Sequence, residues 1–69
     1  MSPFDEVLLQ TIDTIYRRTG GPVRTVALST RLGIARRSVQ RRCRQLESIG
    51  HLARPDGPKS GYTLRSAAA

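Results

Sequence analysis

Apolar residues near the start of the chain recur every three or four positions, which is the spacing of one face of a helix. This stripe comprises Phe4, Leu8, Ile12, Ile15 and Tyr16. Ser2 and Pro3 precede it in the order that a helix cap and a first helical position favour, and the Gly-Gly-Pro sequence at residues 20–22 interrupts it. The pattern therefore predicts an amphipathic helix over residues 3–19 with one buried face.

A second, shorter helix is predicted over residues 26–32, with Thr25 as its cap. Its expected buried residues are Val26, Ala27, Leu28 and Leu32. Gly33 can adopt the left-handed backbone conformation that ends a helix and lets the chain turn sharply. Ile34 then supplies an apolar side chain to cover that turn.

A third helix is predicted from residue 35 or 36 to about residue 49, ending before Gly50. On a helical wheel Val39, Cys43 and Leu46 fall on one side, which we expect to face the core. The opposite side is basic and polar. It comprises Arg37, Arg41 and Arg44, flanked by Arg36 and Gln40, with Ser38 near the start of the helix.

The period of the pattern changes to two after Gly50. Residues 51–54 and 61–65 are predicted as short strands, with Leu52, Tyr62 and Leu64 on the inward side. Residues 55–60 between them are rich in turn-forming types, so we expect a β-hairpin with an open loop. Earlier in the chain, residues 23–24 are candidates for a further brief strand.

The charge is strongly positive and unevenly placed. The 69 residues include 12 Lys and Arg against 5 Asp and Glu, a formal net charge of +7. Arginines outnumber lysines eleven to one, and nine arginines but no acidic residue lie between Thr14 and Leu46. The excess of positive charge favours a polyanionic partner. The dominance of arginine favours contacts in which the planar guanidinium matches the geometry of a phosphate or a guanine. A basic face kept for solubility is the alternative, but such faces usually mix both signs.

The composition also excludes several classes of protein. Cys43 is the single cysteine, so no internal disulfide forms, and with the lone His51 it cannot complete a zinc site of four protein ligands. The sequence has no glycine-rich phosphate loop, metal-ligand cluster or activated nucleophile, so we expect a non-enzyme without cofactors. No apolar run reaches the roughly 18 residues that span a membrane, and no secretory signal is evident.

Residues 32–41, Leu-Gly-Ile-Ala-Arg-Arg-Ser-Val-Gln-Arg, with residues 46–52, Leu-Glu-Ser-Ile-Gly-His-Leu, resemble the helix-turn-helix and wing entry of winged-helix regulators of the MarR type. The chain is also similar to the DNA-binding domain of LexA-type repressors, including Thr-Gly-Gly-Pro at residues 19–22. The likeness covers residues 5–65. It implies an α+β fold, mainly α: a winged helix-turn-helix of three helices plus a C-terminal β-hairpin wing.

Two further expectations concern the end of the chain and the start of the third helix. We place the domain at residues 1–65 and a disordered tail or linker at residues 66–69. Ala35 departs from the family pattern, because such families often carry a serine cap at that position. If no other group replaces this cap, we expect the start of the helix to be weaker by about 1 kcal/mol, and one phosphate contact to be absent.

The resemblance implies that the third helix enters the major groove of double-stranded DNA, and that the wing reaches an adjacent minor groove or its phosphates. The residues implied nearest to the bases are Arg36, Arg37, Ser38, Gln40 and Arg41. The residues implied to contact the backbone are Thr25, Arg44, Arg54 and Lys59. We therefore expect a sequence-specific DNA-binding repressor of transcription, either in the bacterial or archaeal cytoplasm or encoded by a phage and associated with the nucleoid.

Other roles of the same fold remain as alternatives: a protein-interaction or RNA-binding module in a replication, recombination or phage or plasmid maintenance complex. The arginines of the third helix disfavour a protein partner, and the small number of aromatic residues disfavours single-stranded RNA. The third helix also has too little apolar area to bind a membrane surface by itself. Because one winged helix contacts one half-site, we expect a homodimer, an additional domain or a partner protein.

Overall fold

The first helix begins and ends at the predicted residues. In the computed structural model, which describes residues 2–55, 57 and 61–65, α1 spans Pro3–Thr19. The Ser2 hydroxyl accepts a hydrogen bond from the Asp5 amide at 3.2 Å, and the Asp5 carboxylate accepts one from the Ser2 amide at 3.3 Å. This reciprocal pair is a capping box. At the other end the Gly20 amide donates to the Tyr16 carbonyl at 2.7 Å, which closes the last turn.

The buried face of α1 is shorter than its apolar stripe. Leu8 and Ile12 are fully buried, and Phe4 and Ile15 are partly buried against the core. Tyr16 was predicted to be buried, but 42% of it is exposed, so that prediction is wrong. Tyr16 lies at the edge of the stripe and in the last turn of α1, where it lines an open surface hollow with the hairpin and stays outside the core.

The second helix, α2, spans Thr25–Leu32 and starts one residue earlier than predicted. Its cap is Arg24, whose side chain makes no capping hydrogen bond, and Thr25 is the first helical residue rather than the cap. Leu28 is fully buried and Leu32 partly buried, whereas Val26 and Ala27 are exposed, contrary to expectation. The reason is that two turns of helix bury a single face, and Leu28 and Leu32, four residues apart, occupy it.

The turn after α2 and the third helix agree with the sequence pattern. Gly33 has φ 68°, and its amide donates to the Ser29 carbonyl at 2.9 Å, ending α2. The third helix, α3, spans Arg36–Ser48, with Ala35 as a cap that lacks any side-chain hydrogen bond. Its predicted core residues are at most 1% exposed: Val39, Cys43 and Leu46.

A small antiparallel sheet follows α3. Strand β1 (Leu52–Ala53) pairs with β2 (Thr63–Leu64) so that Leu52 lies opposite Leu64. Leu52 is buried as predicted, but the prediction for Leu64 is wrong: it is 39% exposed and lines a surface hollow with the exposed Tyr16. The predicted hairpin is thus present, although residues 56 and 58–60 of its loop, and the predicted tail at residues 66–69, lie outside the described residues.

The segment before α2 joins this sheet through one residue. Val23 and Tyr62 form an isolated bridge in which each amide donates to the other's carbonyl at 2.8 Å, in place of the predicted brief strand at residues 23–24. Gly61 makes this approach possible, because a Cβ there would lie 2.6 Å from the Val23 carbonyl. Tyr62 itself is 4% exposed, as the alternating pattern predicted.

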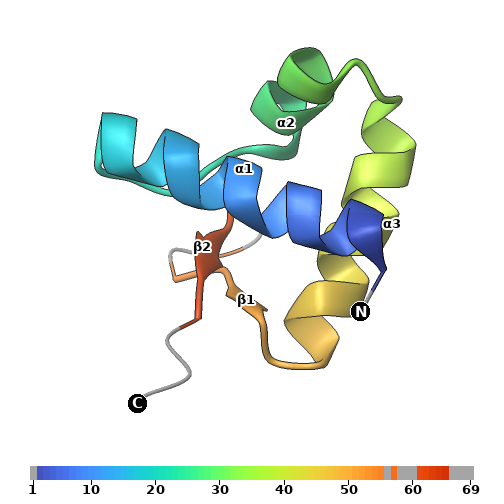
Figure 1. Ribbon diagram of the computed structural model, residues 1–69. Coiled ribbons are helices and arrows are strands. Elements are labelled where there is room, and N and C mark those ends of the chain that lie inside the picture. Colours follow the sequence, from blue (N-terminus) through green and yellow to red (C-terminus); the bar gives the residue numbers. More distant parts are fainter. Residues whose placement is uncertain (1, 56, 58–60, 66–69) are drawn as a thin grey trace.

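The three helices, β1 and the two residues of the Val23–Tyr62 bridge contribute to a single core. Its buried members are Leu8, Ile12, Val23, Leu28, Val39, Cys43, Leu46, Leu52 and Tyr62. Figure 1 shows α1 crossing the molecule between α2 and the β-hairpin, with α3 along one side. The architecture is therefore α+β and mainly helical: three helices and a two-stranded antiparallel sheet.

The buried thiol of Cys43 is expected to lower the stability of the fold at alkaline pH. Burial raises the pKa of Cys43 from 9.0 to about 12, and the nearby Glu47 carboxylate adds to the rise. Because the folded-state pKa is the higher one, this contribution to stability is complete below about pH 9 and is lost as the pH rises toward 12. We expect the urea-unfolding free energy of the wild type to fall above pH 9 more steeply than that of Cys43→Ala. Parallel pH profiles of the two proteins would contradict this prediction.

Candidate nucleic-acid interface

The side of α3 that points away from the core carries the predicted base-contacting residues. All of them are exposed: Arg36, Arg37, Ser38, Gln40 and Arg41, together with Arg44. We call the set Arg36, Arg37, Gln40, Arg41 and Arg44 the α3 basic face. Its direction is fixed by burial of the opposite side of the helix, since residues half a turn from a buried stripe must face solvent.

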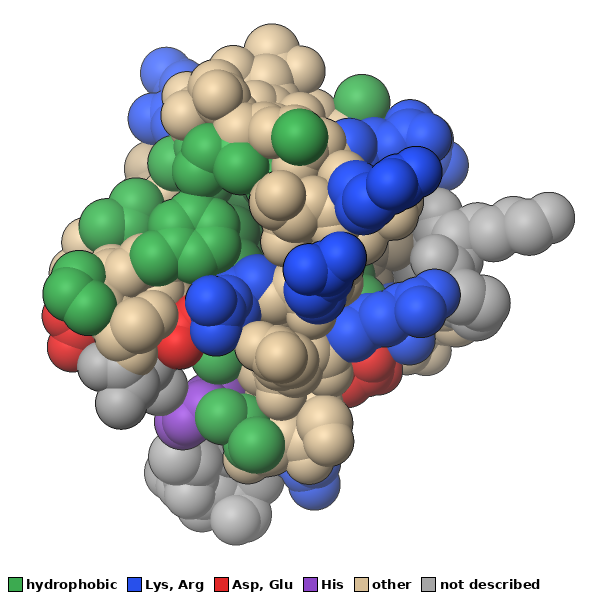
Figure 2. Space-filling view, turned by 90° about the vertical axis from the view of Figure 1, so that its right-hand side faces the viewer, with side chains coloured by type: hydrophobic (Ala, Val, Ile, Leu, Met, Phe, Trp, Pro, Cys, Tyr) green, Lys and Arg blue, Asp and Glu red, His purple; other side chains and the backbone are tan. Residues whose placement is uncertain are grey.

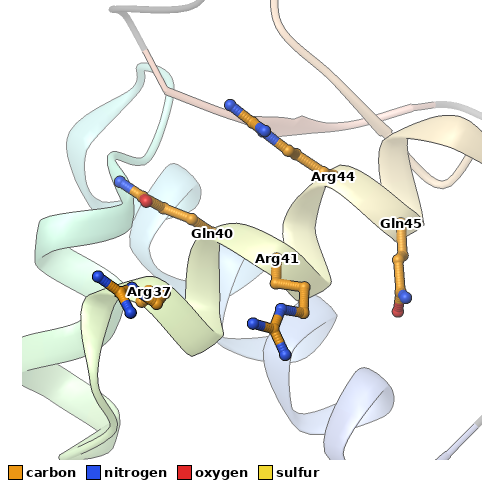
Figure 3. A pocket seen from close by; sticks show the side chains of 5 residues that line it. All are labelled: Arg37, Gln40, Arg41, Arg44 and Gln45. Carbon is orange, nitrogen blue, oxygen red and sulfur yellow. The ribbon is translucent and has the colours of Figure 1, made fainter.

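The α3 basic face is an open surface with a shallow hollow. A hollow of about 380 Å³ is lined by Arg37, Gln40, Arg41, Arg44 and Gln45. Figure 3 shows Gln40 and Arg44 extending in one direction from successive turns of α3, while Arg41 and Gln45 extend in another. Donor groups therefore stand along both flanks of the helix and remain open to a large ligand.

Four arginines of this face are free of acidic partners among the described residues: Arg36, Arg37, Arg41 and Arg44. Glu47 is the one acidic residue of α3, and it is paired with Arg54. Figure 2 shows the resulting cluster of cationic side chains over the side of the molecule on which α3 lies. Uncompensated charge of one sign concentrates a positive potential there.

Arg42, in the middle of α3, lies outside the basic face. Its Nε is 3.3 Å from Asp5 Oδ1, a charge contact whose geometry falls short of a hydrogen bond. Its guanidinium also lies 5.8 Å from the centre of the Phe4 ring and donates to Gln45 at 3.1 Å. Arg42 thus connects α3 to the first turn of α1, and its guanidinium is already engaged in contacts within the protein.

A second, smaller cleft adjoins the basic face where α2, α3 and the hairpin meet. It measures about 170 Å³ and is lined by Thr25, Gln40, Arg44, Arg54 and Tyr62. The structure therefore brings three of the predicted phosphate contacts to one place: Thr25, Arg44 and Arg54. Arg36 and Ser38 line neither hollow, and Lys59 lies outside the described residues.

Arg54 lies in this second cleft but is already engaged. Its Nη2 and Nε donate to the two Glu47 carboxylate oxygens at 2.9 and 3.2 Å. This hydrogen bonding raises the pKa of Arg54, so the guanidinium is charged throughout the usual range of pH. The guanidinium also lies 5.2 Å from the centre of the Tyr62 ring.

Sequence reasoning missed two residues of these surfaces, Gln45 and Tyr62. Gln45 lies four residues after Arg41 and hence on the same side of α3, so helical spacing was sufficient to find it. Tyr62 was assigned to the core, which is correct, and its place in the cleft depends on the hairpin folding back toward Arg44. No local pattern carries that information.

Neither metal ligands nor a membrane-spanning helix is found in the part of the chain that the structure describes. No three His, Cys, Asp or Glu side chains come together there as a possible metal site. None of the helices there has the length and apolar composition required to cross a bilayer.

Comparison of the chain with protein-family models and with curated proteins finds no match.

The uncapped start of α3 offers a direct test of how the basic helix is held. Ala35 is exposed and supplies no side-chain acceptor for the first amides of α3. We expect Ala35→Ser to stabilise the domain by about 1 kcal/mol, raising the melting temperature by about 4–8 °C. Ala27→Ser, at an exposed position inside α2, is the control and should slightly lower it. Equal melting temperatures for wild type and Ala35→Ser would show that the first amides of α3 do not need this cap.

Proposed function

We propose that this protein binds double-stranded DNA in a sequence-specific manner, with α3 in the major groove, and regulates transcription as a repressor. The observation that carries the proposal is the α3 basic face, with four arginines that have no acidic partner among the described residues. The major groove of B-DNA is about 12 Å wide and admits one α-helix. A helix with guanidinium and amide donors on its outer side suits that groove.

The spacing of the donors supports base recognition as well as charge attraction. Arg37 and Arg41 are four residues apart, which is about 6 Å along a helix and close to two base-pair steps. Arginine donates two parallel hydrogen bonds to guanine, and Gln40 can pair in the same way with adenine. In this proposal Arg44 and Thr25 contact phosphates beside the groove.

The arrangement of α2, α3 and the hairpin favours a winged helix-turn-helix. The helices α2 and α3 pack together and are joined by the short turn at Gly33. In a helix-turn-helix the first of two such helices crosses the backbone while the second enters the groove. The β1–β2 hairpin directly after α3 then takes the place of the wing.

A single copy of α3 reads about one half-site, so the proposal includes a second DNA-binding unit, as a homodimer or in a partner protein. Single-stranded RNA receives less support, because base stacking needs exposed aromatic rings beside the cationic surface. The exposed Tyr16 is in the last turn of α1, at the end of the molecule away from α3 (Figure 1).

The first test is duplex binding by fluorescence anisotropy across a salt series. We expect the protein to bind a random-sequence duplex with a log–log salt slope of about −0.9 per phosphate contacted. The double variant Arg37→Ala/Arg41→Ala should lose most of this affinity. The control Arg17→Ala/Arg18→Ala removes the same charge from the far end of α1 and should lose little. A folded wild type that does not bind duplex at low salt, or equal losses in both double variants, would overturn the proposal.

A second test separates base contacts from phosphate contacts on a target obtained by selection from random duplexes. Arg41→Ala should lower discrimination at one base pair by about 1–3 kcal/mol. Arg44→Ala and Lys59→Ala should instead weaken binding to all sequences alike, and each should reduce the salt slope by about 0.9. Competition with single-base variants of the target measures both effects. Unchanged preference in Arg41→Ala would remove this residue from the base-reading set.

A further inference from the structure

An ion pair with two hydrogen bonds joins the end of α3 to the hairpin. Arg54, directly after β1, donates two hydrogen bonds to Glu47 of α3 at 2.9 and 3.2 Å. A two-point contact between guanidinium and carboxylate fixes direction as well as distance. Only 25% of the Arg54 side chain and 31% of the Glu47 side chain are exposed, so water screens the pair less than at an open surface.

Arg54 also contacts Tyr62, the residue that precedes β2. Its guanidinium lies 5.2 Å from the centre of the Tyr62 ring, within the range of an attractive cation–π contact. Tyr62 in turn is bonded through its backbone to Val23, two residues before α2. The Arg54 side chain therefore contacts α3 and the residue before β2, and the backbone of that residue is bonded to the segment that leads into α2.

The partner of Arg54 has a charge that opposes the proposed function. Glu47 is the one acidic residue of α3, on the helix that carries the α3 basic face. A bare carboxylate near a DNA backbone would repel the phosphates, and pairing with Arg54 cancels that charge. The cleft beside the pair is also lined by Arg44, which has no acidic partner among the described residues.

We propose that Arg54 is a positioning residue that holds the hairpin against α3 and neutralises Glu47, and that it does not contact a DNA phosphate. The part of this inference that concerns DNA rests on the proposed function, and the part that concerns the hairpin does not. The opposite arrangement is that Arg54 leaves Glu47 on binding and takes a phosphate, as its place after the first strand of a wing would suggest. The two arrangements differ in what happens when both charges of the pair are removed.

The stability test uses the protein without DNA. Arg54→Lys, Arg54→Gln and Glu47→Gln should each lower the melting temperature by several degrees, because each removes the two-point contact. The double variant Glu47→Gln/Arg54→Gln should lose less than the sum of the two single glutamine variants. Arg65→Gln, an exposed arginine next to β2 without an ion pair among the described residues, is the control and should leave the melting temperature unchanged. Unchanged melting temperatures in the single variants, or strictly additive losses, would overturn the positioning role.

The binding test repeats the duplex salt series at a temperature where circular dichroism shows every variant folded. Arg54→Gln should weaken binding severalfold because it leaves Glu47 uncompensated. The double variant, whose net charge equals that of the wild type, should recover the wild-type salt slope and most of the affinity. A double variant whose slope stays reduced by about 0.9 would show that Arg54 contacts a phosphate and would overturn the inference. If the wild type binds no duplex, the proposed function fails, and the melting temperatures still decide the role of Arg54 in the fold.

Discussion

The position of the α3 basic face depends on the burial of three side chains on the other side of the same helix. Val39, Cys43 and Leu46 are at most 1% exposed and pack in one cluster with Leu8 of α1 and Leu28 of α2. Each such burial stabilises the fold by about 1.5–3 kcal/mol for a full-sized apolar side chain. Because the two faces of a helix rotate together, this apolar packing sets the direction of the arginines. The polar face makes few contacts of its own and is free for a ligand.

The ion pairs of the described residues lie outside that face and leave its arginines uncompensated. Three acidic residues of the described chain each hold one arginine: Asp13 with Arg17 at 3.1 Å, Asp5 with Arg42 at 3.3 Å and Glu47 with Arg54 at 2.9 Å. None of these arginines belongs to the α3 basic face. The net charge of +7 is therefore not spread evenly over the molecule, because four of the eight described arginines that have no acidic partner lie on α3. This segregation supports a ligand with a regular row of negative charges more strongly than net charge alone does.

Local signals in the sequence were sufficient to locate the helices and the inward side of α3. Caps and turn residues act over three or four positions, so Ser2 and Gly33 mark helix ends without knowledge of the fold. Burial at the margins was not predictable in this way. Tyr16 and Leu64 continue the apolar patterns of their elements but lie beyond the reach of the core. A period in the sequence shows which face turns inward, whereas the extent of the buried area depends on where the neighbouring elements stop.

The availability of each arginine was the least predictable property, because it depends on contacts between segments that are separate in the sequence. Position after a strand marked Arg54 as a free cation of a wing, yet the turn at Gly50 brings β1 back against α3, where Glu47 accepts both of its hydrogen bonds. Arg42 directly follows Arg41 in the sequence. The rotation between successive residues of a helix turns its side chain toward α1, where it lies beside Asp5. Composition thus indicates the class of partner for a basic domain of this kind. The ion pairs formed between distant segments then decide which of its arginines remain available to bind an anionic ligand.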